Sequence, residues 1–364
     1  MKSPEPEIIQ LLVHGGPGTG KSYLTSCIYQ KALEMGYFIS CMAPTGIAAS
    51  NLPNGRTIHN QFGFKITDLK SLIFLPDLPA DQLNALQARF KSEKLIMIVI
   101  DEISYISPEM LAQIDNRLRQ LMGKPETPFG GIAVLLMGDF FQLPPVATRY
   151  TLYGACVKMI QEKKELEDTP GPKTRGTMLF SKFKMIELTQ QMRAALDVDH
   201  TNFLNQLRMP RPGQPRINAD HMKKLQTLTS NDIKEDTLWQ WASIVVTSNK
   251  ERMVINNYQS SSWARYHSVP RFVWEIPLRG RLAATVRTAA HTYIYQYFPA
   301  FTGCFVSGAS GYLTENINPS LGLSNGTQVK QKKNLKALLI INHIQSHVIV
   351  LSPAGDVSFL DPSS

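Results

Sequence analysis

Gly15-Gly16-Pro17-Gly18-Thr19-Gly20-Lys21-Ser22 is the stretch that decides the fold, because it matches the phosphate-loop pattern G-x-x-x-x-G-K-[ST] in full. An apolar run, Ile8 to Val13, precedes it, and a predicted helix, Tyr23 to Met35, follows it. This strand–loop–helix setting is the one in which the motif binds phosphates. We therefore expect a nucleotide site here, and the alternative is a glycine-rich turn that binds nothing.

Each residue type in this loop has a chemical reason to be there. Glycines let backbone N–H groups converge on phosphate oxygens, and the following helix adds its positive dipole end. We expect Lys21 to reach the β- and γ-phosphates of ATP and Ser22 to hold Mg²⁺ through its hydroxyl. The predicted nucleotide-binding residues are Gly15, Gly16, Pro17, Gly18, Thr19, Gly20, Lys21 and Ser22.

Bulk properties narrow the class of protein. The 364 residues favour about two domains, and the net charge of +9 suits a polyanionic partner such as nucleic acid, although charge alone is a weak indicator. The four cysteines form no C-x-x-C pair, which favours free thiols in a reducing compartment over a zinc site. With no apolar run of membrane-spanning length and no signal-peptide pattern, we expect a soluble, intracellular protein that makes no membrane contact.

The first half of the chain alternates apolar strands with helices, which predicts an α/β fold with a parallel sheet. The predicted strands are Ile8–Val13, Phe38–Met42, Leu95–Ile100 and Val134–Met137, and the clearest helix is Pro108–Met122. A polar motif follows each strand, so the four motifs should converge at the carboxyl edge of the sheet.

The domain plan has a first domain over residues 1–184 and a second over residues 185–364. Residues 64–94 form an excursion with a helix near Ala80 to Lys91, and residues 161–176 form an exposed loop. The second domain is expected to hold helices at His200–Leu207 and Lys250–Trp263, and strands at Ser243–Thr247 and within Leu335–Leu360.

Asp101 and Glu102 follow a buried apolar strand, where an acidic pair is unfavourable unless a cation or a proton-transfer role offsets its desolvation. We expect Asp101 to orient Mg²⁺ and Glu102 to position and deprotonate the attacking water. The alternative is a solvated helix cap.

Two further motifs complete the predicted catalytic set of Lys21, Glu102, Gln142 and Arg193. Gln142, in Gly138–Pro145, is placed to contact the γ-phosphate or the attacking water, and the alternative is an ordinary turn with a proline stop. Arg193, in Leu188–Arg193, is a candidate arginine finger, and the alternative is a surface arginine.

Two segments offer hydroxyls, backbone amides and aromatic rings of the kind that contact single-stranded nucleic acid. These are Thr45-Gly46 and Gly55–Phe62. For Phe62 and Phe64, a place in the hydrophobic core is the favoured interpretation.

Together these motifs resemble superfamily 1 DNA helicases of the Pif (petite integration frequency) type, a family that includes the helicase portion of Helitron transposons. The residues that carry the resemblance are, in family order, Gly15–Ser22, Ala43–Ala49, Gly55–Phe62, Asp101–Ser104, Gly138–Val146, Leu188–Arg193, Thr247–Asn256, Leu313–Pro319 and Gly322–Thr327.

The resemblance implies tandem RecA-like domains of the P-loop NTPase class with ATP and Mg²⁺ between them. It also implies 5′-to-3′ translocation on single-stranded DNA, unwinding of forked DNA, and roles in DNA repair, recombination or telomere maintenance. ATP-site roles carry onto Lys21, Ser22, Asp101, Glu102, Gln142 and Arg193, and DNA contacts onto Thr45, Gly46, Thr57 and His59. Nuclear and mitochondrial members both occur in the family, and the sequence shows no address.

Two departures from the family pattern separate the rival interpretations. No glutamine motif for adenine precedes the phosphate loop, and His343–His347 does not match the family's final H-K-x-Q-G motif, so we expect a truncated second domain. The alternatives are a DNA-stimulated ATPase that translocates without unwinding, and a degenerate transposon-derived fragment that binds nucleotide and DNA without turnover. A generic P-loop ATPase leaves Gly138–Val146 and Asn325–Thr327 unexplained.

Overall fold

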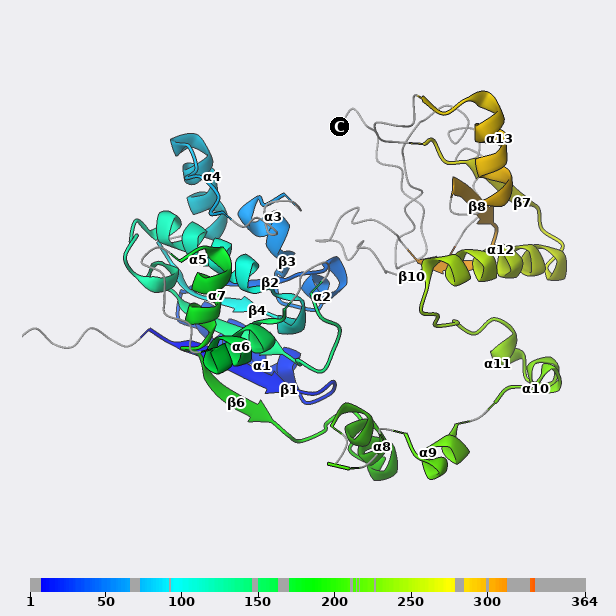
Figure 1. Cartoon of the computed structure of the whole chain (residues 1–364), viewed down its shortest axis with the longest axis horizontal. Coiled ribbons are helices and arrows are strands. Elements are labelled where there is room, and N and C mark those ends of the chain that lie inside the picture. The colour runs from blue at the N-terminus through cyan, green and yellow to red at the C-terminus, as the bar shows by residue number, and fades with distance from the viewer. Residues whose placement is uncertain are drawn as a thin grey trace, which may run out of the picture. The chain divides into compact units, whose positions relative to one another are not determined.

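The computed structural model describes residues 8–65, 73–91, 93–145, 150–162, 170–209, 212–213, 215, 217–225, 227–278, 285–298, 301–312 and 328–330. Its described residues form two compact units, one up to Leu225 and one from residue 227 onward. Figure 1 shows the helices and strands of each unit.

The first unit is built on a six-stranded parallel sheet. Its strands are β1 (Gln10–Gly15), β2 (Phe38–Ala43), β3 (Arg56–Thr57), β4 (Leu95–Ile100), β5 (Ala133–Gly138) and β6 (Lys184–Leu188). The strand order is β3-β2-β4-β5-β1-β6, and every pairing in it is parallel. The carboxyl ends of all six strands therefore meet at one edge, which confirms the predicted convergence of the polar motifs.

Helices connect these strands and follow the last of them. They are α1 (Lys21–Glu34), α2 (Gly46–Ser50), α3 (Ile58–Phe62), α4 (Ala80–Phe90), α5 (Pro108–Met122), α6 (Leu152–Glu162), α7 (Pro172–Phe180), α8 (Val198–Arg208) and α9 (Ala219–Lys224). The structure gives α5 the bounds expected from its apolar face. Both ends of the exposed loop expected over 161–176 are helical instead, because α6 runs to Glu162 and Pro172 takes the first position of α7, where its fixed φ favours a helix.

Alternating side chains of the strands build two cores, one on each face of the sheet. On one face Ile98 and Leu136 pack with Leu111 and Leu118 of α5. The helices α3, α4, α6 and α7 contribute to the same cluster. On the other face, Val99 and Leu135 pack with α1 and α2. A sheet buried on both faces explains the nearly continuous apolar runs of its strands.

Polar side chains of α5 hold the segment that leads into α4. The Gln113 side chain donates to the Ile73 carbonyl at 2.9 Å and accepts from the Leu75 N–H at 3.1 Å. One turn further, Arg117 donates to the Pro76 carbonyl at 2.9 Å. Gln113 and Arg117 lie on one face of the helix, so both reach the backbone of the same extended segment. The expected excursion is thus fastened to the first unit.

The first unit runs past the expected boundary between residues 184 and 185. Strand β6 pairs with β1 in parallel, from Leu11 opposite Lys184 to Gly15 opposite Leu188, so it belongs to the first sheet. Helices α8 and α9 follow within the same unit, which continues to Leu225. The second unit therefore begins about 40 residues later than the sequence suggested.

The second unit contains α10 (Ser230–Glu235), α11 (Thr237–Gln240), α12 (Asn249–Tyr266), β7 (Arg271–Glu275), α13 (Thr288–Tyr297), β8 (Thr302–Val306), β9 (Ser310–Tyr312) and β10 (Gln328–Lys330). The pairs β7–β8 and β9–β10 are antiparallel. The indole of Trp263 donates to the Ser307 carbonyl at 3.2 Å and so ties α12 to the end of β8. A RecA-like second domain stays a prediction.

Of the elements expected in the second unit, a helix is present and one strand is not. The expected helix Lys250–Trp263 is α12, which begins one residue earlier after the Ser248 cap and runs three residues further. The expected strand Ser243–Thr247 is irregular, with Val245 96% exposed, because no described strand pairs with it. The expected strands within Leu335–Leu360 and the motif residues 313–327 and 343–347 lie outside the described residues.

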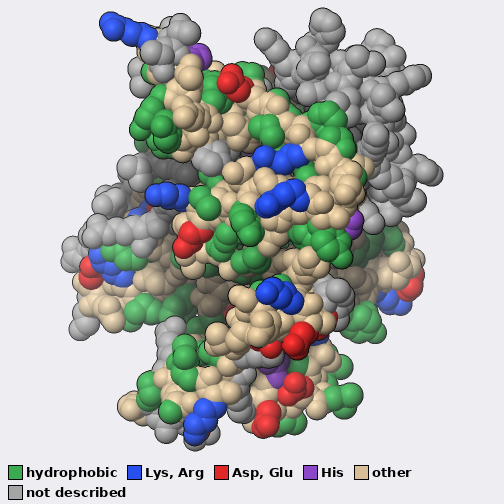
Figure 2. Space-filling view, turned by 90° about the vertical axis from the view of Figure 1, so that its right-hand side faces the viewer, with side chains coloured by type: hydrophobic (Ala, Val, Ile, Leu, Met, Phe, Trp, Pro, Cys, Tyr) green, Lys and Arg blue, Asp and Glu red, His purple; other side chains and the backbone are tan. Residues whose placement is uncertain are grey.

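The described surface shows no single basic patch on the face drawn in Figure 2. There, Lys and Arg side chains are scattered among hydrophobic and other groups. No helix in the described ranges has the length and apolarity needed to cross a bilayer. All four cysteines are free thiols, as expected.

Candidate nucleotide site

The phosphate loop joins β1 to α1 at the carboxyl edge of the sheet. Gly18 and Gly20 have φ values of 79° and 93°, which only glycine adopts without strain. A side chain at Gly18 would also collide with Gln191. The glycines of the motif are thus required by backbone conformation and by close approach of another segment.

Lys21, the first residue of α1, turns its side chain back into the loop. Its Nζ donates to the Gly15 carbonyl at 2.7 Å and to the Gly16 carbonyl at 2.9 Å. Burial lowers the pKa of this ammonium, and the charges of Asp101, Asp139 and Glu102 oppose that shift. Three carboxylates from two other strand ends therefore act on the loop lysine.

The acidic pair follows β4, the central strand beside β5. Asp101 is 8% exposed, and its Oδ1 accepts the Glu102 N–H at 2.9 Å. Burial raises the pKa of Asp101, while that hydrogen bond and the Lys21 charge oppose the rise. Burial and then the Asp101 charge raise the pKa of Glu102, and Lys21 opposes them. A carboxyl with a raised pKa is better suited to accept a proton from water.

The backbone of Glu102 is left-handed, with φ 57° and ψ 52°. Non-glycine residues held in this conformation cluster at functional sites, because the surrounding structure must impose it. Gly138 at the end of β5 explains part of that constraint. Its φ is 145°, and a Cβ there would lie 2.6 Å from the Ile103 nitrogen. The ends of β4 and β5 therefore approach each other closely beside the phosphate loop.

The segment after β6 covers the tip of the phosphate loop. The backbone N–H groups of Met192 and Arg193 donate to the Gly18 carbonyl at 2.8 and 3.2 Å. The Gln191 side chain donates to the Pro17 carbonyl at 2.8 Å. Arg193 is thus brought to the loop by its backbone, while its side chain is exposed. The finger role remains a prediction.

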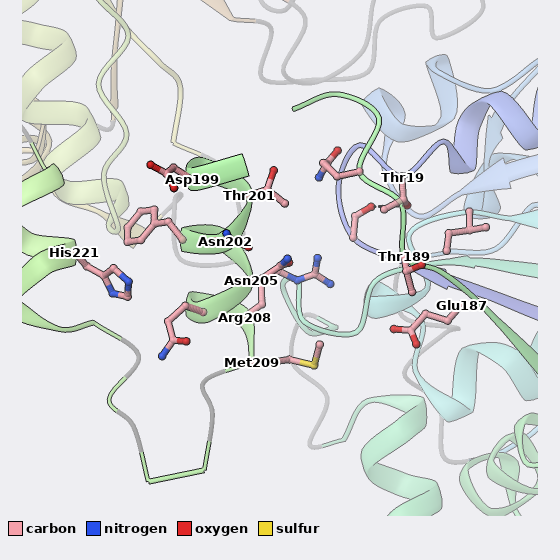
Figure 3. Close-up of a pocket in the computed structure, with 15 residues that line it drawn as sticks. Thr19, Glu187, Thr189, Asp199, Thr201, Asn202, Asn205, Arg208, Met209 and His221 are labelled. Atoms are coloured by element: carbon pink, nitrogen blue, oxygen red, sulfur yellow. Dashed lines mark hydrogen bonds between the residues drawn. The ribbon is translucent and has the colours of Figure 1, made fainter. Parts of the chain in front are cut away.

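A cavity of about 600 Å³ opens beside the loop, between the end of β6 and helix α8 (Figure 3). Gly16 and Thr19 of the loop, with Thr189 after β6, line one side of it, and Asn205 and Arg208 of α8 line the other. Its walls are rich in hydroxyl and amide groups. A polar cavity that includes part of a phosphate loop has the chemistry expected of a nucleotide site.

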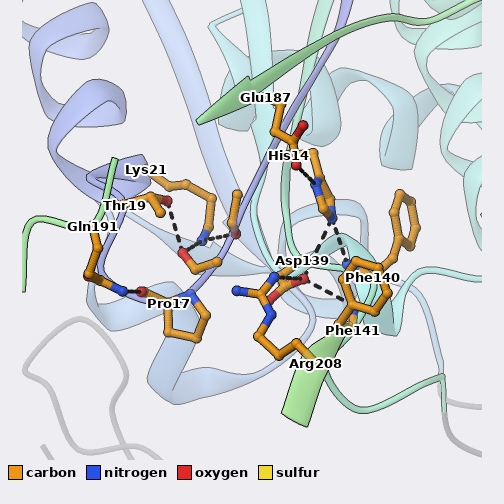
Figure 4. A network of polar contacts seen from close by, with 12 residues as sticks. His14, Pro17, Thr19, Lys21, Asp139, Phe140, Phe141, Glu187, Gln191 and Arg208 are labelled. Atoms are coloured by element: carbon orange, nitrogen blue, oxygen red, sulfur yellow. Dashed lines mark hydrogen bonds and ion pairs between the residues drawn. The ribbon is translucent and has the colours of Figure 1, made fainter. Parts of the chain in front are cut away.

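Asp139 is the centre of a polar network that the sequence did not single out (Figure 4). Its Oδ1 accepts from Arg208 Nη2 at 2.8 Å and from the Phe141 N–H at 3.1 Å, and lies 3.5 Å from His14 Nε2. Burial raises the pKa of Asp139, but hydrogen bonds from His14 and Phe141 and the Arg208 charge outweigh it, so the net pKa is lowered. Asp139 is therefore a buried carboxylate held in its ionised form.

The proton of His14 decides which of two bonds its Nε2 makes. Nε2 lies 3.3 Å from the Phe140 N–H, which it accepts only when unprotonated, and it donates to Asp139 only when protonated. His14 Nδ1 lies 3.8 Å from Glu187.

Three network members, His14, Asp139 and Arg208, were missed by sequence reasoning. Asp139 lies in the recognised Gly138–Pro145 motif, directly after an apolar strand. A carboxylate in that position could have been predicted to need a cationic partner, because a buried charge is unfavourable alone. Arg208 ends an ordinary amphipathic helix, and nothing local marks it. Gln142 lies on the turn after Asp139, its N–H donating to the Asp139 carbonyl at 3.1 Å, and its role stays a prediction.

The predicted DNA contacts lie at the ends of β2 and β3, on the far side of β4 from β5 and β1. Thr45 and Thr57 cap α2 and α3, accepting the Ala48 and Asn60 N–H groups. Gly46 begins α2 and is buried, and His59 lies in the first turn of α3. The predicted DNA contacts and the phosphate loop thus lie at the same edge of the sheet, with β4 and β5 between them.

The aromatic pair of this region belongs to the core. Phe62 and Phe64 are 3% and 7% exposed, and their rings stack with centroids 5.3 Å apart. Rings buried in this way have no free face for a base, so the favoured interpretation is confirmed.

The donors around the loop fit a magnesium ion that also takes phosphate oxygens. Ser22 is exposed at the start of α1, and Asp101 stands at the end of β4. Within the described residues, no three His, Cys, Asp or Glu side chains could hold a metal ion by themselves. Mg²⁺ commonly takes one or two protein oxygens with phosphates and water, so this sparse donor set is the expected kind.

Comparison with known proteins identifies the class. Residues 5–208 match the family model described as PIF1-like helicase. The chain is 25% identical to the ATP-dependent DNA helicase PIF1 of Xenopus laevis over 349 residues, which is 93% of this chain and 47% of that protein.

Two solved structures share the fold. One, described as the basis for DNA unwinding at forked duplex DNA by two coordinating Pif1 helicases, gives a TM-score of 0.56 at 21% identity, covering 90% of this chain and 68% of that one. The Pif1 helicase from Bacteroides in complex with ADP-AlF3 and single-stranded DNA gives 0.51 at 20% identity, covering 90% and 66%. This chain spans less than half the length of the Xenopus relative.

Proposed function

This chain belongs to the PIF1-like helicase family, and we propose that it hydrolyses ATP to move 5′ to 3′ along single-stranded DNA and unwind duplex. The observation that carries the proposal is the meeting of three charged motifs at one edge of the sheet. The loop lysine, the acidic pair after β4 and the Asp139 network after β5 act on one another electrostatically. A site for phosphate transfer needs this arrangement of cation and carboxylates.

Within that site, Glu102 is the group we assign to the attacking water. Its raised pKa and its imposed backbone conformation both favour a general base held in one orientation. Lys21 binds the β- and γ-phosphates once it leaves the loop carbonyls, and Arg193 supplies a second charge from the segment that covers the loop. Mg²⁺ bound to Ser22 and Asp101 would neutralise phosphate charge.

Single-stranded DNA is the polymer we assign to the β2 and β3 ends of the sheet edge. Thr45 follows β2 and Thr57 ends β3, so both lie at the carboxyl edge of the sheet that also carries the phosphate loop. A family relative has been solved with single-stranded DNA, and another structure concerns forked DNA. Repair, recombination and telomere maintenance are the processes in which such a motor would act, in the nucleus or in mitochondria.

The test is ATP turnover by the full chain with and without a single-stranded dT oligonucleotide. Lys21→Ala and Glu102→Gln should each lower DNA-stimulated turnover at least about 100-fold, because both remove transition-state interactions. Lys31→Ala is the matched control, since Lys31 is an exposed lysine of α1 that pairs only with Glu34 among the described residues. Unchanged turnover in Glu102→Gln would overturn the base assignment.

A strand-displacement assay on a forked duplex then separates the rival activities. Displacement that requires ATP supports a helicase. DNA-stimulated turnover without displacement identifies a translocating ATPase, and a basal rate insensitive to DNA identifies a nucleotide-binding fragment of the family.

A further inference from the structure

Arg208, the last residue of α8, contacts two parts of the nucleotide site at once (Figure 4). Its Nη2 donates to Asp139 at 2.8 Å, and its guanidinium lies over the Phe141 ring, 5.5 Å from the centroid. Its Nη1 lies so close to the phosphate loop that a side chain added at Gly16 would collide with it. One guanidinium therefore touches both the Asp139 loop and the loop that would hold phosphates.

The Arg208–Asp139 pair has one donor and one acceptor atom that form no hydrogen bond with the described residues. Arg208 Nε and Asp139 Oδ2 are both buried, and neither has a hydrogen-bond partner among the described residues. Asp139 is 1% exposed. Buried polar atoms without partners are costly and are usually found where a ligand or water completes the set. Arg208 also lines the cavity beside the loop, so a ligand bound there would lie beside its guanidinium.

The two partners differ in how much they depend on each other. Two contacts of Asp139 do not involve Arg208: its Oδ1 accepts the Phe141 N–H at 3.1 Å and lies 3.5 Å from His14 Nε2. Among the described residues Arg208 forms one ion pair, with the Asp139 carboxylate, and its side chain is 23% exposed against 1% for Asp139. The arginine is therefore the partner that is able to leave, and the carboxylate remains supported.

We propose that Arg208 is a further phosphate-binding cation, beside Lys21 and Arg193, which exchanges the Asp139 carboxylate for the terminal phosphate of ATP. The inference rests on the proposed function and adds a residue that the sequence did not mark. A guanidinium binds phosphate and carboxylate through the same planar fork, so the two compete directly. When Arg208 moves to the phosphate, the Phe141 ring loses the cation above it. The Gly138–Pro145 loop, which carries Gln142, is then released from α8.

Competition gives the proposal a signature that mere structural support does not share. Arg208→Ala should weaken binding, because it removes a phosphate ligand. Asp139→Asn should tighten binding, because it removes the competitor while its amide oxygen still accepts the Phe141 N–H. The effect should be larger for a triphosphate than for a diphosphate, since the terminal phosphate is the group bound.

The experiment measures the Kd of fluorescent ATP and ADP derivatives, with Mg²⁺, for the full chain. Arg208→Ala should raise the Kd for the ATP derivative about tenfold or more, and Arg208→Lys should recover part of the loss, because it keeps the charge without the fork. Asp139→Asn should lower that Kd several-fold. Lys31→Ala should match wild type, and thermal unfolding of each variant reports whether it is folded.

Three results are decisive. A wild-type Kd in Arg208→Ala, with a raised Kd in Lys21→Ala, overturns the exchange and leaves the proposed function intact. Weaker binding in Asp139→Asn also overturns it, because the pair would then be a support for the loop. A wild-type Kd in Lys21→Ala contradicts the proposed function itself. If Arg208→Ala does not fold, Arg208→Lys and Asp139→Asn carry the test.

Discussion

Glu102 holds a left-handed backbone, φ 57° and ψ 52°, in the turn that follows β4. This conformation costs a residue with a side chain about 1–2 kcal/mol relative to glycine. The surrounding structure sustains it through the Asp101 carboxylate, which accepts the Glu102 N–H, and through the close approach of Gly138 to Ile103. Stability is therefore spent at the one carboxyl that we assign to the attacking water.

Glu102→Gly should consequently make the protein more stable and inactive together. Relief of the strained conformation, offset by the flexibility of glycine in the unfolded chain, should raise the melting temperature by about 2–4 °C. ATP turnover should fall to the level of Glu102→Gln. Thermal unfolding and ATPase assays check the two parts.

Ser268→Gly provides the comparison, because Ser268 is also left-handed, at φ 50°, and is exposed after α12. It should keep wild-type turnover. A lower melting temperature in Glu102→Gly would show that the side chain stabilises the turn more than its backbone strains it.

Sequence analysis reached the residues whose setting is local and missed those whose partners are distant. The glycines of the phosphate loop were predictable because its turns place Gly18 and Gly20 at positive φ. Arg208 was not, because its role arises from Asp139, which is 69 residues away and is met only after α8 packs beside the phosphate loop. His14 was hidden in an apolar strand for the same reason.

Among the elements, α5 shows how one helix fastens several others. Ser107 caps it by accepting the Met110 N–H at 3.1 Å, Pro108 opens it, and Gly123 ends it with φ 62°. Those signals are local, which explains why its bounds were predictable. The fully buried Asp115 near its middle was not predictable as a hub. It accepts the Phe129 N–H and bonds to Arg119 and Arg175, so it joins α5 to α7 and to the turn before β5.

Asp115→Ala should therefore destabilise the first unit by about 2–4 kcal/mol, because it leaves two arginines and a buried N–H without their acceptor. Arg119 and Arg175 are 12% and 28% exposed, so water can solvate them in part, and the loss of stability should be smaller than for a fully buried pair. Urea unfolding gives the measurement. Glu126→Ala, at an exposed acid after the same helix, should shift the transition by less than about 0.5 kcal/mol.

Strand β6 marks the limit of element-level prediction. Its five residues, Lys184–Leu188, pair only with β1 in the described sheet, and Met185 and Ile186 are 63% and 51% exposed. An edge strand with exposed apolar residues carries little pattern that assigns it to a sheet. The sequence therefore placed it at the start of a second domain, while its backbone pairing places it in the first.

At the scale of the whole molecule, the sheet order arranges two predicted ligand sites along one edge. The strands β1 and β5 lead to the phosphate loop and Asp139, β2 and β3 lead to the predicted DNA contacts, and β4 with its acidic pair lies between them. The fold class and this convergence were predictable, because parallel strands share a carboxyl edge. The boundary between the units was not, because it depends on packing beyond β6.

The net charge of +9 should appear as a salt dependence of DNA binding. Each phosphate neutralised on a single strand contributes about −0.7 to the slope of log affinity against log salt, so four contacts would give about −3. The measurement is the affinity for a dT oligonucleotide from about 50 to about 200 mM salt, a range over which electrostatic binding weakens strongly. Lys21→Ala should show the same slope without nucleotide. A slope near zero would contradict an electrostatic contact with the strand.

The strand order also has a consequence for folding during synthesis. Strand β1 is synthesised before both of its neighbours, because in the described sheet it hydrogen-bonds only to β5 and β6, with Gln10 opposite Val134 and Leu11 opposite Lys184. At about 5–20 residues per second, it waits several seconds to tens of seconds for its first neighbour. During that interval β1 lacks the neighbouring strands that flank the phosphate loop in the folded sheet, so we expect folding during synthesis to benefit from a chaperone that shields apolar segments.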